Sequence, residues 1–150
     1  MIKILFVCHG NICRSVMAEY IFKDIVKKKG REDLFEVSSA ATTYEETGND
    51  IYPPAKRTLQ KHGIPFGTHH AHRITAAEEE RYDLIIGMDD ENRYSLQRMF
   101  PRSRKISLLL DYTAHPRDVA DPWYTRDFEK TYRDLVQGCS ALLEYIMKET

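Results

Sequence analysis

The stretch ILFVCHGNICRS, residues 4–15, decides how this chain folds. Its first four residues are apolar and contain no glycine or proline, which is typical of a short buried strand in a parallel sheet. A loop from Cys8 to Ser15 follows, and an amphipathic helical pattern starts at once and runs to about Lys29. A loop between a strand and a helix can turn its amides inward beside the positive end of the helix. The sequence therefore predicts an anion site after the first strand.

Two side chains of this loop add chemistry to that site. Cys8 and Arg14 are separated by five residues. The guanidinium of Arg14 offers a planar fork of donors suited to two phosphate oxygens, and the same positive field favours the thiolate form of Cys8, the nucleophilic form of cysteine. We expect phosphate to be bound by the loop residues after the cysteine: His9, Gly10, Asn11, Ile12, Cys13, Arg14 and Ser15.

Strands and helices alternate along the rest of the chain. Beyond a first strand at 2–7, the pattern predicts strands at 35–41, 83–88 and 105–110 and helices at 15–29, 53–62, from Thr75 onward, 89–99 and 126–148. This alternation indicates a parallel sheet with helices on both faces. Ligands bind at the carboxyl ends of the strands in such sheets. We therefore expect the Cys8 loop, the segment 39–45, Asp89 and Asp121 to meet in one cleft.

Length and composition fit one domain, residues 1–150, with one core and no linker or repeat. A net charge of −1 gives no reason to expect nucleic acid as a partner.

The N-terminal apolar run is too short for membrane insertion or for a signal peptide. Three cysteines do not form a secreted disulfide framework, so we expect a cytoplasmic protein. His69, His70 and His72 lack a partner at ligand spacing, so we expect solvated loop histidines, no metal and no cofactor.

The pair of motifs CHGNICRS and Asp121-Pro122-Trp123-Tyr124 resembles the low-molecular-weight protein tyrosine phosphatase family, and the resemblance runs over nearly the whole chain. It implies a flavodoxin-like, three-layer α/β sandwich with a four-stranded parallel sheet of order 2-1-3-4. It also implies hydrolysis of phosphotyrosine in proteins, with Cys8, Arg14 and Asp121 as catalytic residues and inorganic phosphate as product and competitive inhibitor. The partners it implies are a phosphotyrosine-containing protein and a cognate tyrosine kinase.

The chemistry expected of these residues is a double displacement. Cys8 attacks phosphorus to form a phosphocysteine. A departing phenolate, with a parent pKa near 10, needs a proton. Asp121 is the candidate donor, and its carboxylate can then deprotonate the attacking water. Pro122 restricts Asp121 to extended backbone conformations, which helps to hold the acid in one place.

Several residues of the site have two interpretations. Ser15 can cap the following helix, and the resemblance implies that its hydroxyl also stabilises the Cys8 thiolate. Asn11 suits a turn with positive φ, and the resemblance places it in a supporting network with Ser39 and His69, although His69 could equally be an exposed loop residue. Cys13 can be a small buried side chain, or, as the resemblance implies, a resolving thiol for oxidised Cys8.

The sequence defines the walls of the substrate slot less well than it defines the anion site. Trp123 and Tyr124 are expected to form one wall, although ordinary core packing is the alternative. A slot lined in this way favours phosphotyrosine over the shorter phosphoserine. On the opposite wall the family usually has an aromatic residue where this chain has Glu45, with Tyr44 beside it. Another departure is Ala71-His72-Arg73, where the family more often has Ala-Arg-Gln.

Three other functions use similar parts. An arsenate reductase needs extra cysteines, and this chain offers only Cys139, which we expect in the core of the last helix. A phosphoryl carrier would not need a general acid such as Asp121 of the Asp-Pro motif. A non-catalytic phosphotyrosine-binding module would not need both Cys8 and Asp121.

Overall fold

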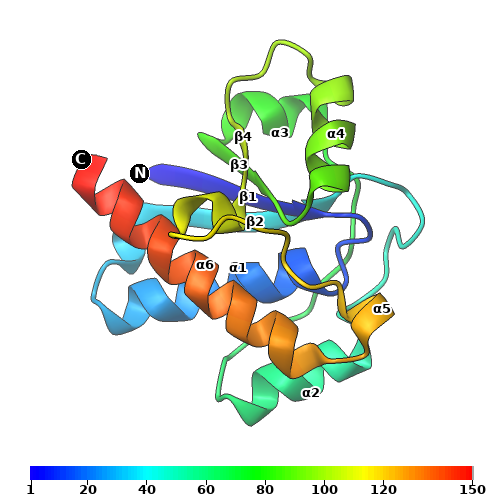
Figure 1. Cartoon of the computed structure of the whole chain (residues 1–150), viewed down its shortest axis with the longest axis vertical. Helices are drawn as coiled ribbons and strands as arrows, with labels where there is room; N and C mark the ends of the chain where they lie inside the picture. The colour runs from blue at the N-terminus through cyan, green and yellow to red at the C-terminus, as the bar shows by residue number, and fades with distance from the viewer. Residues whose placement is uncertain (150) are drawn as a thin grey trace.

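The fold is built on a four-stranded parallel sheet of order β2-β1-β3-β4 (Figure 1). The computed structural model describes residues 1–149, so Thr150, the last residue of the expected domain, lies outside the described residues. The strands are β1 (Ile2–Cys8), β2 (Phe35–Ala41), β3 (Leu84–Gly87) and β4 (Ile106–Leu108). Each neighbouring pair is parallel. The predicted α/β class and the strand order are confirmed.

Helices cover both faces of this sheet. Figure 1 shows α3 (Ala76–Arg81) and α4 (Asp90–Met99) on one face, and α1 (Arg14–Lys28) and α6 (Phe128–Glu149) on the other. The remaining elements are α2 (Pro53–Lys61), α5 (Pro122–Thr125) and the short 3-10 turns Glu32–Leu34 and Leu109–Tyr112. The result is the predicted three-layer arrangement.

The alternating side chains of β1 divide the core in two. Ile4, Phe6 and Cys8 belong to the large cluster that contains residues of α1 and α6. Leu5 and Val7 belong to the smaller cluster on the α4 side. Cys8 is the last residue of the central strand β1, and its side chain belongs to the cluster on the α1 side of the sheet.

The fourth strand is shorter than predicted. It ends at Leu108, and the next residues turn into a 3-10 helix instead of continuing to position 110. The Asp111 carboxylate accepts the backbone N–H of Leu108 at 3.0 Å, which closes this turn. Leu109 and Leu110 are still fully buried, so the apolar pattern marked burial correctly but not the type of backbone.

The Asp121 motif was expected in a loop, but residues 122–125 form the short helix α5. Asp121 caps it by accepting the Trp123 N–H at 3.0 Å, and Pro122 occupies the first helical position, where its missing N–H costs nothing. Arg126 then adopts a left-handed conformation with φ 60°, which separates α5 from α6. The last helix therefore begins at Phe128, two residues later than predicted.

Within residues 1–149, no helix has both the length and the apolar character that a bilayer span requires.

Candidate active site

The Cys8 sulfur lies inside the loop of residues 8–15, which we call the anion loop. The backbone N–H groups of Asn11 and Ser15 donate to Sγ at 3.3 and 3.4 Å, respectively. Asn11 has φ 62°, as its position in the predicted turn suggested, and this left-handed residue turns the loop around the sulfur. Cys8 is 3% exposed. Two amides directed at one sulfur are an environment that stabilises negative charge there.

Ser15 is directed at the same sulfur. Its Oγ lies 3.0 Å from Sγ of Cys8 and accepts a hydrogen bond from Nδ2 of Asn11 at 2.8 Å. With that lone pair engaged, the hydroxyl proton is free to point at a Cys8 thiolate. The helix α1 begins at Arg14 with Cys13 as its N-cap residue, so the capping role considered for Ser15 is wrong.

The network behind the loop contains Asn11, Ser15 and His69 as expected, but not Ser39. Nε2 of His69 lies 2.6 Å from the backbone oxygen of Asn11, and since that oxygen only accepts, Nε2 carries the proton. His69 is 9% exposed, so it is not the solvated loop histidine that was one expectation. The backbone N–H of His72 also reaches Oδ1 of Asn11, at 3.4 Å. The Ser39 hydroxyl instead donates to Oε1 of Glu19 at 2.6 Å, which joins β2 to α1.

Arg14 connects the anion loop to two distant parts of the chain. Its guanidinium donates to Asp89 at 2.8 Å, to the backbone oxygen of Val119 at 3.2 Å and to Asp121 at 3.4 Å. Burial alone would lower the pKa of this guanidinium, but the charges of Cys8, Asp89 and Asp121 raise it above its ordinary value. Arg14 is 3% exposed and therefore held in place as a permanent cation. The predicted meeting of the Cys8 loop with Asp89 and Asp121 is therefore confirmed.

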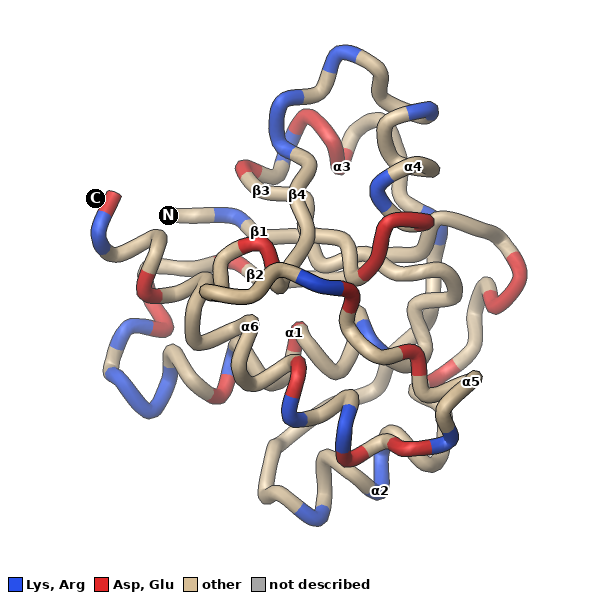
Figure 2. The backbone as a smooth tube through the Cα atoms, in the orientation of Figure 1, with Lys and Arg blue, Asp and Glu red and all other residues tan. Residues whose placement is uncertain are grey.

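Asp89 was expected in the cleft as a helix cap, and its contact with Arg14 was missed. One carboxylate oxygen accepts the Asn92 N–H at 2.8 Å and caps α4, while the other pairs with Arg14. Figure 2 shows that the acidic residues at the start of α4 and those before α5 lie on the same side of the molecule. There, burial and the carboxylates of Asp90 and Asp89 raise the pKa of Asp118.

Asp121 lies directly beside the anion loop. Its backbone is extended, with φ −86° and ψ 110°, as expected before proline. Oδ1 accepts the Trp123 N–H at 3.0 Å, while Oδ2 lies 3.4 Å from Nη2 of Arg14. The side chain is 30% exposed, so the carboxylate is accessible from outside the protein.

The expected wall residues lie on the surface. Tyr44 is 71% exposed, Trp123 47% and Tyr124 83%, which rules out ordinary core packing for them. The Trp123 ring lies against the ring of Tyr52, with centroids 5.3 Å apart. Glu45 reaches the anion loop directly, with Oε2 2.7 Å from Nε2 of His9.

Two further hydrogen bonds fix the loop that carries Tyr44 and Glu45 to the anion loop. The Thr42 N–H donates to the Cys8 oxygen at 2.9 Å, and the Thr43 hydroxyl donates to the His9 oxygen at 3.0 Å. These contacts place Tyr44 beside the mouth of the site.

The other two cysteines differ sharply from each other. Cys13 is in the anion loop; burial first, and then the negative charges of Cys8 and Asp121, raise its pKa to about 12. Cys139 is fully buried in α6, as predicted. All three cysteines are free thiols.

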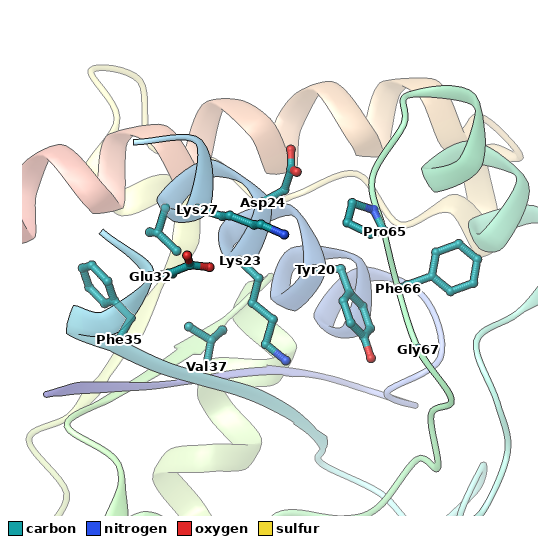
Figure 3. Close-up of a pocket in the computed structure, with 11 residues that line it drawn as sticks. Tyr20, Lys23, Asp24, Lys27, Glu32, Phe35, Val37, Pro65, Phe66 and Gly67 are labelled. Atoms are coloured by element: carbon teal, nitrogen blue, oxygen red, sulfur yellow. The ribbon is translucent and has the colours of Figure 1, made fainter. Parts of the chain in front are cut away.

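A second hollow lies away from the anion loop. Figure 3 shows it between α1, β2 and residues 65–67, with Tyr20, Phe35 and Phe66 among the side chains that line it. It contains none of the predicted site residues. Among residues 1–149, no three His, Cys, Asp or Glu side chains are grouped as metal ligands.

Taken together, the loop places a thiol, two inward-facing amides and a buried guanidinium at the carboxyl edge of a parallel α/β sheet. The profile of the family described as "Low molecular weight phosphotyrosine protein phosphatase" matches residues 3–150, and the chain belongs to this family.

Relatives of known name agree with this assignment. The chain is 40% identical over 153 residues to the low molecular weight protein-tyrosine-phosphatase YfkJ of Bacillus subtilis, covering 99% of this chain and 98% of that protein. It is 36% identical over 149 residues to the human low molecular weight phosphotyrosine protein phosphatase, covering 95% and 94% of the two chains.

Solved structures give the same result. The crystal structure of YfkJ superposes with a TM-score of 0.96 at 40% identity, over 100% of this chain and 97% of that one. The structure of DARP, a drosophila arginine phosphatase, superposes with a TM-score of 0.89 at 30% identity, over 97% and 98%.

Proposed function

We propose that this chain, as one domain of residues 1–150, hydrolyses phosphotyrosine in proteins through a phosphocysteine intermediate. The Cys8 thiolate attacks phosphorus while the bond from phosphorus to the tyrosine oxygen breaks. The proton of the Asp121 carboxyl passes to that oxygen, so tyrosine leaves as a neutral phenol. Arg14 and the anion-loop amides bind the non-bridging oxygens, where negative charge accumulates.

The second step uses the same groups in reverse. The Asp121 carboxylate removes a proton from a water molecule as the water oxygen attacks the phosphocysteine. The bond from phosphorus to sulfur breaks, phosphate is released and the Cys8 thiolate is restored. The hydroxyl of Ser15, 3.0 Å from that sulfur, stabilises it as the leaving group. Inorganic phosphate is thus the product and a competitive inhibitor.

The single observation that carries this proposal is the position of Asp121. It lies 107 residues along the chain from Arg14, yet its carboxylate pairs with that arginine while two amides of the same loop are directed at Cys8. A site that only bound phosphate would gain nothing from a partly exposed carboxylate beside the anion loop, because like charges repel. A general acid for the leaving group accounts for it.

The substrate class follows from the exposed aromatic side chains at the mouth. Tyr44 on one side and Trp123 and Tyr124 on the other can flank an aryl ring. Glu45, on the same loop as Tyr44, adds negative charge and disfavours acidic peptides.

The phosphotyrosine protein would be supplied by a cognate tyrosine kinase. Three free thiols support a reducing, cytoplasmic location.

We also propose that Cys13 is the resolving thiol for Cys8. Hydrogen peroxide oxidises the Cys8 thiolate to a neutral sulfenic acid and is itself reduced to hydroxide and the sulfenic oxygen. This removes one of the charges that hold the Cys13 pKa high. The Cys13 sulfur can then displace hydroxide from that sulfenic acid, giving a disulfide and water. A thiol reductant restores both cysteines.

Two rival functions make different predictions. An arsenate reductase would need Cys139 to pass on a disulfide, and this residue is fully buried in α6. An arginine phosphatase, the activity in the name of the DARP neighbour, would act on phosphoarginine. Its leaving group is a guanidine with no aromatic ring, so the Tyr44 and Trp123 side chains would have no ring to flank.

The test is a substrate panel of phosphotyrosine peptide, p-nitrophenyl phosphate, phosphoserine peptide and phosphoarginine, with wild type and Cys8→Ser. We expect turnover of the two aryl phosphates by wild type and none by Cys8→Ser. Cys139→Ser is the matched control, because it removes a thiol outside the site, and it should retain activity. Turnover of phosphoarginine in preference to phosphotyrosine would overturn the substrate assignment, and activity in Cys8→Ser would overturn the mechanism.

A further inference from the structure

Tyr44 is exposed, yet its ring is held on one face. The guanidinium carbon of Arg73 lies 4.9 Å from the centroid of the Tyr44 ring, and Nη1 of Arg73 donates to the tyrosine oxygen at 3.4 Å. Within residues 1–149, no other aromatic ring packs on Tyr44. Trp123, by contrast, has both the Tyr52 ring and Arg126 beside it. Tyr44 thus depends on a single cation.

Arg73 is itself fixed more firmly than a surface arginine usually is. Its backbone forms a parallel bridge with Ala41, at the end of β2. On either side of it, the Ala41 N–H donates to the His72 oxygen at 2.7 Å and the Ile74 N–H donates to the Ala41 oxygen at 2.8 Å. The side chain adds a third anchor, because Nε donates to the Thr42 oxygen at 3.2 Å.

We propose that Arg73 is a positioning residue that makes Tyr44 a rigid wall of the substrate slot; this inference rests on the proposed function. The guanidinium occupies one face of the ring, and the exposed opposite face is left to stack on the aryl group of the substrate. Arg73 acts through Tyr44 and does not touch the phosphate. In this way Tyr44 provides the aromatic wall although Glu45 stands at the position where an aromatic is usual.

The physical reason is conformational freedom. An exposed tyrosine on a loop loses side-chain entropy when it stacks on a substrate, and a ring already held against a guanidinium has lost that freedom beforehand. The attraction between a cation and an aromatic face also survives in water at exposed sites. Removing the cation should therefore weaken the binding of aryl phosphates and leave the binding of a ringless anion unchanged.

The decisive measurement compares two ligands that differ by one ring, phenylphosphonate and inorganic phosphate. Their inhibition constants or directly titrated affinities give a ratio that does not depend on turnover. In Arg73→Gln we expect the affinity for phenylphosphonate to fall by roughly two- to fivefold, the range that an exposed cation–π contact supplies. The affinity for phosphate should be unchanged, and the KM for a phosphotyrosine peptide should rise by the same factor with kcat nearly constant.

A double-mutant cycle separates positioning from direct contact with substrate. In Tyr44→Ala, the further change Arg73→Gln should have no effect on the affinity ratio. In Tyr44→Phe, Arg73→Gln should still lower the ratio, because the ring contact remains and only the hydrogen bond to the hydroxyl is lost. Arg73→Lys should restore part of the wild-type ratio. The matched control is Arg81→Gln, which removes an arginine that lies over Tyr82 and pairs with Glu36, outside the cleft.

Nuclear magnetic resonance gives a readout that needs no ligand. The side-chain Nε–H proton of Arg73 should be shifted upfield by the Tyr44 ring current in wild type and in Tyr44→Phe, but not in Tyr44→Ala. An equal effect of Arg73→Gln with and without Tyr44 would overturn the proposal, as would an equal loss of phosphate affinity. Failure of wild type to hydrolyse phosphotyrosine would instead overturn the proposed function, since the affinity ratio and the resonance shift test the wall by themselves.

Discussion

The anion loop and the aromatic side chains at its mouth are built in opposite ways. In the loop, Cys8, Asn11, Arg14 and Ser15 are all 3% exposed or less, and backbone amides, side chains and a helix start converge on them. At the mouth, Tyr44, Trp123 and Tyr124 are between 47% and 83% exposed, and stacking contacts hold the first two. The loop cannot change shape without leaving buried polar groups unpaired, whereas the mouth can change one side chain at a time.

This difference teaches where reaction and selectivity reside. The proposed reaction requires the phosphorus, the cysteine sulfur and the acid to be held at fixed positions, and buried, fully paired groups hold them there. Selection among phosphorylated partners needs only a few exposed contacts, each of modest strength. Substitutions in the loop should therefore change rates by orders of magnitude, and substitutions at the mouth should change affinities by small factors.

The largest expected contrast lies between the two thiols inside the loop. With a pKa of about 12, Cys13 at pH 7 has a thiolate fraction on the order of 10⁻⁵. That fraction grows with pH but is still only about 10⁻³ at pH 9. We expect iodoacetamide to label Cys8 and leave Cys13 unlabelled across this range, as measured by peptide mass mapping. Protection of Cys8 by inorganic phosphate is the control, and equal labelling of the two thiols would refute this contrast.

The next largest effect is expected for Asp121→Asn, which removes the proposed proton donor and keeps the side-chain shape. We expect kcat to fall by roughly two to four decades for a phosphotyrosine peptide, and by less for p-nitrophenyl phosphate, whose leaving group needs no proton. The measurement is a series of aryl phosphates of graded leaving-group pKa. A uniform loss across that series would remove Asp121 from the acid role.

Asn11→Ala should affect the loop through its shape. An alanine at φ 62° is strained by about 1–2 kcal/mol, and the hydrogen bond from the amide to Ser15 is lost as well. We expect a lower free energy of unfolding in urea and a loss of activity of one to two decades. Asn11→Gly is the matched control, because glycine accepts this φ but also lacks the amide. Equal free energies of unfolding for the two variants would show that backbone strain does not account for the effect of Asn11→Ala.

The smallest effect is expected at the mouth, for Glu45→Gln. The Glu45 and His9 side chains are 66% and 55% exposed, and an exposed pair of this kind contributes at most about 1 kcal/mol. We expect kcat to be unchanged and the KM for an acidic phosphotyrosine peptide to fall by about two- to threefold, with the difference disappearing at high salt. A neutral peptide is the control. A large change in kcat would show that Glu45 belongs to the reacting groups.

Sequence reasoning worked best where local rules and burial agree. The strand Phe35–Ala41, the capping box at Thr75 and the cap at Asp89 are present as predicted, because caps and apolar runs are local signals. It failed where a distant contact decides the outcome. The partner of the Ser39 hydroxyl is Glu19, which lies on another element and cannot be read from nearby residues. The contact of His69 with Asn11, which the resemblance implied, is present.

The contact of Arg73 with Tyr44 shows the same limit. The sequence marked Arg73 as part of a departure from the family pattern and Tyr44 as the neighbour of another, Glu45, but the two residues are 29 positions apart. The bridge from Arg73 to Ala41 and the hydrogen bond from Arg73 to Thr42 bring them together. The pairing of Arg14 with Asp89 was likewise hidden, although the position of the anion loop and Asp89 after strand ends correctly predicted that they meet.

The measurement that tests the central claim most directly is to trap the intermediate. Wild type turning over p-nitrophenyl phosphate is quenched rapidly in acid and its peptides are mapped by mass spectrometry. We expect one phosphoryl group on Cys8, absent in Cys8→Ser and absent when substrate is omitted. Steady turnover with no phosphoryl group on Cys8, or with the group on another residue, would contradict the mechanism proposed for this site.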